Sequence, residues 1–517
     1  MKQLVPFLSF LFLATVAIAQ DWEEKFKLEA SDQQSDDNHA ISVSLSGDYL
    51  ITGAWHEDHD ASGGNQLSNA GAAYIYRYDS GTDSWSQEAK LVAADREAGD
   101  AFGISVGISG TYAVVGAVEE NAARGAAYVF ERNGSGDWVQ VAKLEAPVRQ
   151  ASDRFGNSVG IYGSTIIVGA YHEDEDANDD DTLQNAGSSY IYTRGGSGSW
   201  GFSQKIVASD RDTNDYFGYS VAIWDDHLIV GAYHRDTPTL SEYGGAYAFE
   251  FNGVEWEQIR IMEAVDTYLG DRFGWSVDVY ENYFMVGAPY HDYDDDEADP
   301  KNNAGAAYIF DASNSWAMDK IVGGDRTAQD NAGQDVAING DRAVLGTPLQ
   351  NYGINGDPPF WSDGGAVFVY EPDGSGFWNQ TQKLLTEDRF TSDKFGHSVD
   401  LDSERIVGGA PEDNSTTGPS TGAAYIFVDG TLSNEDKTAI PLVAYPNPTS
   451  GHFEVQLPRT ALNAQVTIYN MLGQKIATHS FENSRSISIE IVGGSGIYMV
   501  DVTTSEGISE TIQIIKK

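Results

Sequence analysis

The sequence contains no cysteine, which excludes disulfide bonds, thiolate metal sites and a cysteine nucleophile. It is also poor in positive charge, because 31 Lys and Arg residues stand against 78 Asp and Glu residues, a formal net charge of −47. Nucleic acids and anionic membrane surfaces repel such a chain, so we expect neither as a partner. Hydrophobic residues make up 41% and aromatic residues 12% of the 517 positions, enough for a packed core.

Long hydrophobic runs are missing except at the N-terminus. Residues 4–18 are almost entirely apolar, Lys2 precedes them, and Ala17-Ile18-Ala19 has the small-x-small pattern of a cleavage site. This pattern predicts a secretory signal peptide at residues 1–19. No later stretch approaches the ~20 apolar residues of a spanning helix, so we expect no transmembrane segment in the mature chain.

A pattern of four short strands recurs seven times between residues 20 and 432. Each copy holds a strand that starts near a tryptophan, a Phe-Gly-x-Ser-Val step, a Val-Gly-Ala step, and a strand like Gly-Ala-Ala-Tyr-Ile-Tyr. The tryptophans are Trp22, Trp85, Trp138, Trp200, Trp256, Trp316 and Trp378. Units of this kind are too small to bury their own faces, and their repetition predicts an all-β fold with a seven-bladed β-propeller at 20–432.

The order of the strands also predicts how the ring closes. Each tryptophan strand completes the blade of the repeat before it, but the strand at residues 22–28 has no preceding blade. We therefore expect it to pair beside residues 422–427 as the outer strand of the seventh blade, which would remove a free sheet edge.

The steps Phe155-Gly156-Asn157-Ser158-Val159 and Val168-Gly169-Ala170, with their counterparts in the other copies, resemble the FG-GAP repeat. That repeat builds the propellers of integrin α-subunits and of many secreted bacterial proteins. The family often binds calcium in an Asp-rich hairpin between these two steps. Here the hairpin is only a short turn, such as Ser109-Gly110-Thr111, so the resemblance does not transfer that calcium site.

The C-terminal segment differs from the repeats. It contains Tyr445-Pro446-Asn447-Pro448, a run from Ile468 to Gln474, Gly496-Ile497-Tyr498, and a terminal Lys516-Lys517. These motifs resemble the type A sorting domain of the type IX secretion system. The alternating strands predict a small β-sandwich at 441–517, after a linker at 433–440. The resemblance implies contact with the secretion machinery, passage through the outer membrane of a Bacteroidota-type bacterium, and attachment to the surface or release.

Acidic loops are expected on one face of the propeller. Carboxylates in loops suit hard cations, so Ca²⁺ is the candidate cofactor, although solvated loops without metal explain the same pattern. The candidate ligands lie in two loops: Asp174, Asp176, Asp179, Asp181, Asp292, Asp294 and Asp296. Further aspartates recur two and seven positions before the Phe of most copies, and for these we favour a role in turns.

A second pattern, Gly-Ala-aromatic-His, places rings and imidazoles near the same face. Aromatic side chains can stack on sugars and histidines can bind a transition metal, but loop packing and structural hydrogen bonds are the competing interpretation. The candidate ligand face consists of Trp55, His56, Tyr171, His172, Tyr233, His234, Tyr290 and His291.

We predict no catalytic residue. Gly103-Ile104-Ser105-Val106-Gly107 fits the nucleophile pattern of hydrolases, but it lies within a repeated strand and not at a strand-to-helix turn. The sequence thus favours a secreted or cell-surface binding or adhesion protein whose acidic face holds an extracellular protein or glycan, with Ca²⁺ as the candidate cation. The alternatives are a secreted polysaccharide hydrolase or lyase, and a structural component of the cell surface.

Overall fold

The computed structural model describes residues 22–196, 198–236, 242–266, 268–294, 299–353, 360–415, 417–430, 443–445, 447–470, 474–504 and 509–517. The predicted signal peptide (1–19) and linker (433–440) lie outside these residues. Within them the chain is all-β, with only the short turns α1 (Glu120–Ala123) and η1 (Ala312–Asn314) as helical elements. No helix in the described ranges is long and apolar enough to cross a membrane.

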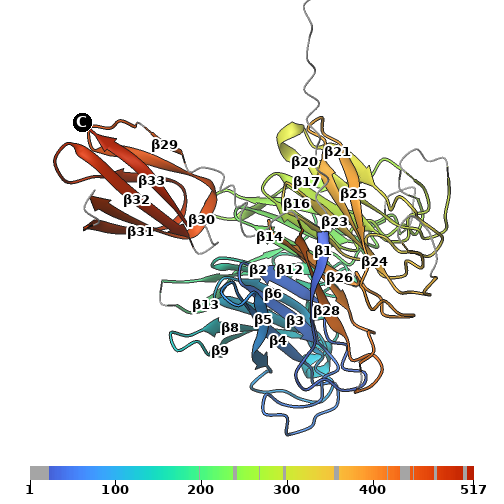
Figure 1. The fold of residues 1–517 in the computed structure, drawn as a ribbon. Helices are drawn as coiled ribbons and strands as arrows, with labels where there is room; N and C mark the ends of the chain where they lie inside the picture. The colour runs from blue at the N-terminus through green and yellow to red at the C-terminus, as the bar shows by residue number, and fades with distance from the viewer. Residues whose placement is uncertain are drawn as a thin grey trace, which may run out of the picture.

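The described residues of the repeat region form seven four-stranded antiparallel sheets (Figure 1). The first contains β2 (Val43–Ser46), β3 (Tyr49–Ala54), β4 (Ala72–Asp79) and β5 (Ser84–Leu91). The second contains β6 (Phe102–Ser109), β7 (Tyr112–Ala117), β8 (Ala126–Arg132) and β9 (Trp138–Leu144). The third contains β10 (Phe155–Tyr162), β11 (Thr165–Ala170), β12 (Ser188–Arg194) and β13 (Trp200–Ile206).

The remaining four sheets follow the same order. The fourth contains β14 (Ser220–Trp224), β15 (His227–Ala232), β16 (Gly245–Phe251) and β17 (Trp256–Met262). The fifth contains β18 (Val277–Tyr280), β19 (Tyr283–Ala288), β20 (Ala306–Asp311) and β21 (Ala317–Ile321). The sixth contains β22 (Val336–Ile338), β23 (Ala343–Thr347), β24 (Ala366–Pro372) and β25 (Trp378–Leu384). The last contains β26 (Ser398–Leu401), β27 (Arg405–Ala410), β28 (Ala423–Asp429) and β1 (Trp22–Leu28).

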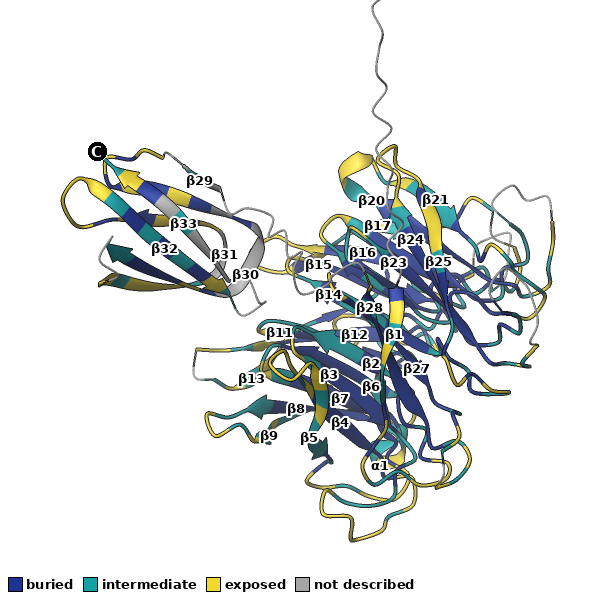
Figure 2. Cartoon of the chain, in the orientation of Figure 1, coloured by how far each residue is buried: buried dark blue, intermediate teal, exposed yellow. Residues whose placement is uncertain are grey.

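The first strands of the sheets contact one another in a closed cycle, from β2 through β6, β10, β14, β18, β22 and β26 back to β2. This arrangement is a β-propeller, as the repeats predicted. The strand that carries the Val-Gly-Ala step is the second strand of each sheet and contacts the first strand of the next sheet, and its central residues are buried (Figure 2). Glycine is required in this step: a Cβ on Gly116 would lie 2.0 Å from the carbonyl oxygen of Gly156 in the next sheet.

The serine of the Phe-Gly-x-Ser-Val step joins adjacent sheets. The Ser42 hydroxyl donates to the carbonyl of Gly103 at 3.0 Å, and the Ser105 hydroxyl donates to that of Gly156 at 2.9 Å. Ser398 completes the ring by donating to Ala40 at 3.0 Å. The serine that fits the hydrolase pattern, Ser105, is therefore a hydrogen-bond donor between blades.

The predicted closing strand is confirmed. β1 pairs with β28 in antiparallel register, from Trp22 opposite Asp429 to Leu28 opposite Ala424 (Figure 1). Trp22 is only 3% exposed, and its backbone N–H donates to the side chain of Gln382 in the sixth sheet at 2.7 Å. The first and last parts of the repeat region thus share one sheet.

The C-terminal segment contains β29 (Val443–Tyr445), β30 (His452–Asn470), β31 (Lys475–Glu490), β32 (Gly496–Thr504) and β33 (Ser509–Lys516). In the described residues these strands form one continuous five-stranded sheet, and β30 pairs with β29, β31 and β32. One buried cluster that includes Phe453, Val466 and Val500 forms its core. The assignment of a two-sheet sandwich stays a prediction.

Candidate functional site

The aspartates that precede each Phe by two positions are turn residues. In every copy that the structure describes, this carboxylate accepts a hydrogen bond from the backbone N–H three residues before it. The acceptors are Asp37, Asp100, Asp153, Asp215, Asp271, Asp330 and Asp393. Burial raises the pKa of Asp153 to about 6 and that of Asp215 to about 7. Their repetition follows from the repeated turn and requires no ligand.

Most of the aspartates seven positions before the Phe form ion pairs with lysines within the blades. Asp32 accepts from Lys90 of the outer strand at 2.7 Å and from the Tyr74 hydroxyl at 2.9 Å. The equivalent pairs, each at 2.6 or 2.7 Å, are Lys143–Asp95, Lys320–Asp266, Lys383–Asp325 and Lys27–Asp388. These carboxylates neutralise lysines whose side chains are nearly buried at Lys90, Lys320 and Lys383 and half-buried at Lys143 and Lys27, because a charge removed from water needs a partner.

The acidic loop after β11 is closed by its own carboxylates. Asp174 accepts from the backbone N–H of Asn185 at 2.7 Å, and Asp179 pairs with Lys205 at 2.8 Å. Asp176 accepts from the N–H groups of Asn178 and Asp180, and these bonds lower its pKa. Asp181 is different: its side chain is 75% exposed and lies 3.9 Å from Arg211.

The loop after β19 repeats this design. Asp292 accepts from the N–H of Asn303 at 2.7 Å, and the backbone carbonyl of Asp294 accepts from Lys320 at 2.7 Å. Asp296 lies outside the described residues. Among the residues that the structure describes, no three His, Asp or Glu side chains form a group that could hold a metal ion. Most of the described aspartates that were predicted to bind Ca²⁺ therefore already accept hydrogen bonds or pair with a lysine within the protein: Asp174, Asp176, Asp179 and Asp292.

A thermal titration tests whether the protein has a specific calcium site. A specific site would give a saturable rise in Tm with CaCl₂ at constant high ionic strength, whereas screening of exposed charges gives the same rise with NaCl. Because Asp174, Asp179 and Asp292 are already bonded within the protein, we expect equal rises for the two salts. A calcium-specific rise that disappears in the variant Asp176→Asn/Asp181→Asn would contradict this expectation.

Aromatic side chains from the third, fourth and fifth sheets form one contiguous surface cluster, which we call the aromatic patch. Ring centroids lie 5.3 Å apart for Tyr171–Tyr219, 4.4 Å for Tyr219–Tyr233, 5.1 Å for Tyr233–Trp275 and 6.0 Å for Trp275–Tyr290. The patch consists of Tyr171, His172, Tyr216, Tyr219, Tyr233, His234, Arg272, Trp275 and Tyr290, all half-buried. The structure therefore brings together ligand-face candidates from the third, fourth and fifth repeats.

The side chains of the patch come from two kinds of position in the repeat. Tyr171, Tyr233 and Tyr290 follow the ends of β11, β15 and β19. Tyr216, Tyr219, Arg272 and Trp275 flank the Phe-Gly steps of the fourth and fifth copies, and the sequence analysis missed them. For Tyr216, Tyr219 and Trp275 the sequence signal was an aromatic residue at a position that holds Asn, Ala, Ile, Gln, His or a basic residue in most other copies. Arg272 matches Arg154 and Lys394 and gave no such signal.

Arg272, the tyrosine hydroxyls and the imidazoles of His172 and His234 are polar groups of the patch. The Arg272 guanidinium lies 4.3 Å from the Tyr290 ring centroid and 5.3 Å from that of Trp275, which orders these side chains. Burial raises the pKa of Tyr233 to about 12, so its phenol stays neutral under physiological conditions. The patch thus offers several ring faces, one cation and neutral hydroxyls.

The structure corrects one predicted member of the ligand face. His291 is fully buried, where Nδ1 lies 2.7 Å from Asp271 and Nε2 lies 2.8 Å from Lys320. Pro289 takes the position that an aromatic residue has in other copies, which shifts Tyr290 to the histidine position and His291 into the ion cluster. Trp55 and His56, in the turn after β3, stack on each other with ring centroids 3.9 Å apart.

Comparison with known families agrees with this geometry. Six segments match the family described as the FG-GAP repeat, at residues 22–76, 85–130, 138–192, 200–249, 256–310 and 378–427. They cover more than half of the chain, which therefore belongs to the FG-GAP repeat family. Residues 443–517 match the secretion system C-terminal sorting domain, which marks the protein for export across the outer membrane, to the cell surface or into the medium.

Among solved structures, the chain is similar to the crystal structure of Saccharomyces cerevisiae Sqt1, with 10% identity and a TM-score of 0.41. The similarity covers 95% of this chain and 98% of that one. No curated protein sequence matches the chain.

Proposed function

We propose that this secreted or surface β-propeller protein is a non-enzymatic binding protein that holds a glycan on the aromatic patch. The contiguity of the half-buried rings of Tyr219, Tyr233, Trp275 and Tyr290 supports this proposal most directly. Aromatic faces pack against the apolar C–H faces of sugar rings, while neutral hydroxyls and one cation supply hydrogen bonds. A run of rings across three blades suits a chain of several sugars.

The charge of the protein favours a neutral glycan. At −47 the chain repels polyanionic polysaccharides in the same way as it repels nucleic acids. Arg272, the one cation among the patch residues, is already stacked on Tyr290 at 4.3 Å. A protein ligand is the second candidate, because Tyr, Trp and Arg dominate the binding energy of protein interfaces.

Two carboxylates beside the patch are engaged, which supports binding without turnover. Asp215 accepts hydrogen bonds from the backbone N–H groups of Asp212 and Asp236, and Asp271 is bonded to His291. A glycoside hydrolase needs two carboxylates that face its substrate, one of them free to donate a proton. A surface-structural role remains the third alternative, and it predicts no saturable ligand.

A glycan panel tests the proposal. The variants Trp275→Ala and Tyr290→Ala should each weaken binding about fivefold, since one stacked ring contributes about 1 kcal/mol. The matched control is Phe202→Ala, which removes a 48% exposed ring from the outer strand β13. Unchanged binding in both patch variants, or an equal loss in the control, would contradict glycan binding at this patch. Release of shortened products would instead support the hydrolase or lyase alternative.

A further inference from the structure

Neighbouring blades repeatedly enclose an arginine against aromatic rings. Between the second and third sheets, Tyr112 and Trp200 meet edge to face at 5.8 Å. The Arg194 guanidinium lies 5.0 Å from the Tyr112 centroid and 3.5 Å from the Glu131 carboxylate. Cation–π attraction and an ion pair thus hold one guanidinium between two blades.

The same arrangement recurs elsewhere in the ring. Between the first and second sheets, Tyr49 and Trp138 lie 5.8 Å apart, and Arg132 lies 5.7 Å from the Tyr49 ring and 2.6 Å from Glu88. At two further junctions the arginine stands at the tyrosine position instead: Arg342 lies 5.1 Å from the Trp22 ring between the sixth and last sheets, and Arg405 lies 5.5 Å from the Trp85 ring between the last and first sheets. The space between blades is therefore repeatedly built for a guanidinium.

Between the fifth and sixth sheets the surroundings are kept but the arginine is replaced. Tyr283 and Trp378 meet edge to face at 5.6 Å, as Tyr112 and Trp200 do. Asp311 lies opposite Tyr283 in the strand ladder, as Glu131 lies opposite Tyr112. Pro372, however, lies opposite Trp378, at the position where Arg194 lies opposite Trp200.

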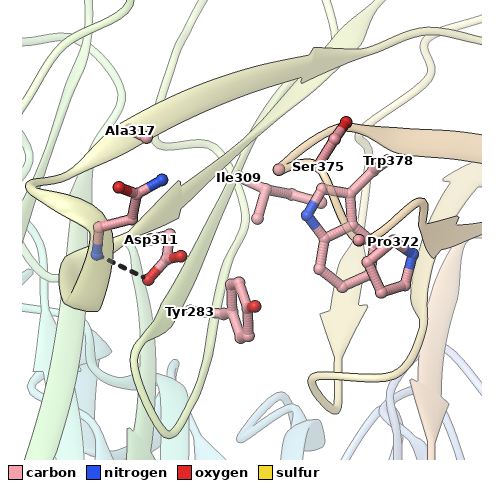
Figure 3. A pocket seen from close by; sticks show the side chains of 10 residues that line it. Tyr283, Ile309, Asp311, Ala317, Pro372, Ser375 and Trp378 are labelled. Atoms are coloured by element: carbon pink, nitrogen blue, oxygen red, sulfur yellow. Dashed lines mark hydrogen bonds between the residues drawn. The ribbon is translucent and has the colours of Figure 1, made fainter.

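A groove of about 300 Å³ is found at this place. Figure 3 shows Asp311 and Tyr283 on one side of it, with Trp378 and Pro372 on the other. Asp311 Oδ1 accepts hydrogen bonds from the N–H groups of Ser313 and Asn314, which fix the orientation of the carboxylate. The volume is at the small end for ligand sites and suits one side chain rather than a larger ligand.

We propose that this groove binds the guanidinium of an arginine side chain on a partner protein. The rings of Tyr283 and Trp378 and the carboxylate of Asp311 take the roles that Tyr112, Trp200 and Glu131 have around Arg194. The net charge of −47 adds long-range attraction for a basic partner. This site is separate from the aromatic patch and does not depend on the proposed glycan binding.

The probe is the peptide acetyl-Gly-Arg-Gly-amide, titrated into the full mature protein and followed by saturation-transfer NMR. The matched probe replaces arginine with citrulline, which keeps the shape of the side chain and removes its charge. We expect the citrulline peptide, and the arginine peptide with the Asp311→Asn variant, to bind at least tenfold more weakly. Equal binding of the two peptides to the unaltered protein would overturn the proposal.

Two further variants test the groove without removing its rings. Pro372→Arg restores the residue type of the second and third sheets, so it should fill the groove, abolish peptide binding and raise Tm by about 1–2 °C. Arg194→Ala should open an equivalent groove and increase the number of bound peptides from one to two. Full peptide binding by a folded Pro372→Arg protein, as judged by circular dichroism, would also overturn the proposal.

Discussion

A mature chain that begins at Ser31, and therefore lacks β1, is expected to lose most of its folding stability and to aggregate. β1 buries Trp22 and Leu28 and covers the whole edge of β28, from Ala424 to Asp429. Without it the last sheet presents unpaired backbone groups, which pair readily with other chains. The loss should exceed about 4 kcal/mol, the range reached when core packing and a strand ladder are removed together. Thermal melting and light scattering measure it.

The control for this deletion changes the same strand without removing it. Glu23 is exposed and lies opposite Val428, so Glu23→Ala should leave the melting curve nearly unchanged. The loss of stability in Trp22→Ala should lie between that of the deletion and that of Glu23→Ala, because this change removes a buried ring but keeps the strand ladder. An unchanged melting curve for the deletion would mean that the ring does not depend on β1.

A chain that ends at Asn434 is expected to fold and to remain in the periplasm. Residues 443–517 match a sorting domain of the secretion system, and those of them that the structure describes form their own sheet and core. Loss of this domain should reduce surface or medium levels by at least tenfold, while the propeller itself keeps its blades. Cell fractionation and protease accessibility on intact cells measure the distribution.

The control for export is the full-length Trp275→Ala variant, which alters the aromatic patch and keeps the sorting domain. It should reach the surface or the medium at the level of the unaltered protein. If the chain that ends at Asn434 appeared there at the same level, the sorting role of the C-terminal domain would be refuted.

The propeller could be predicted from the sequence because the close contacts between its blades are possible for only a few residue types. Gly116 faces the backbone of the next blade, and Ser42 and Ser105 bond to that backbone, so each copy repeats these types. Ring closure also followed from strand order alone. The sequence could not show that β30 pairs with three other strands, because its partners follow no repeat.

The candidate site was predicted less well, and the reasons are physical. Periodic carboxylates suggested a metal, but a sequence does not reveal that Asp32 meets Lys90 or that Asp174 closes its own loop. Tyr216 and Trp275 join the aromatic patch across blades, and such contacts depend on how neighbouring sheets are placed. The missing arginine at Pro372 becomes informative only after the ladders of equivalent blades are compared.

The pairing of β1 with β28 also sets the order of events during folding. β1 is synthesised first and its partner almost last, so the ring cannot close until nearly the whole propeller has been made. Contacts between such distant residues form slowly, and β28 keeps a free edge until they do. During that interval the β1 of one molecule can pair with the β28 of another, giving an exchanged dimer with the same blades. The amount of this dimer should grow with the concentration at which the unfolded protein is refolded.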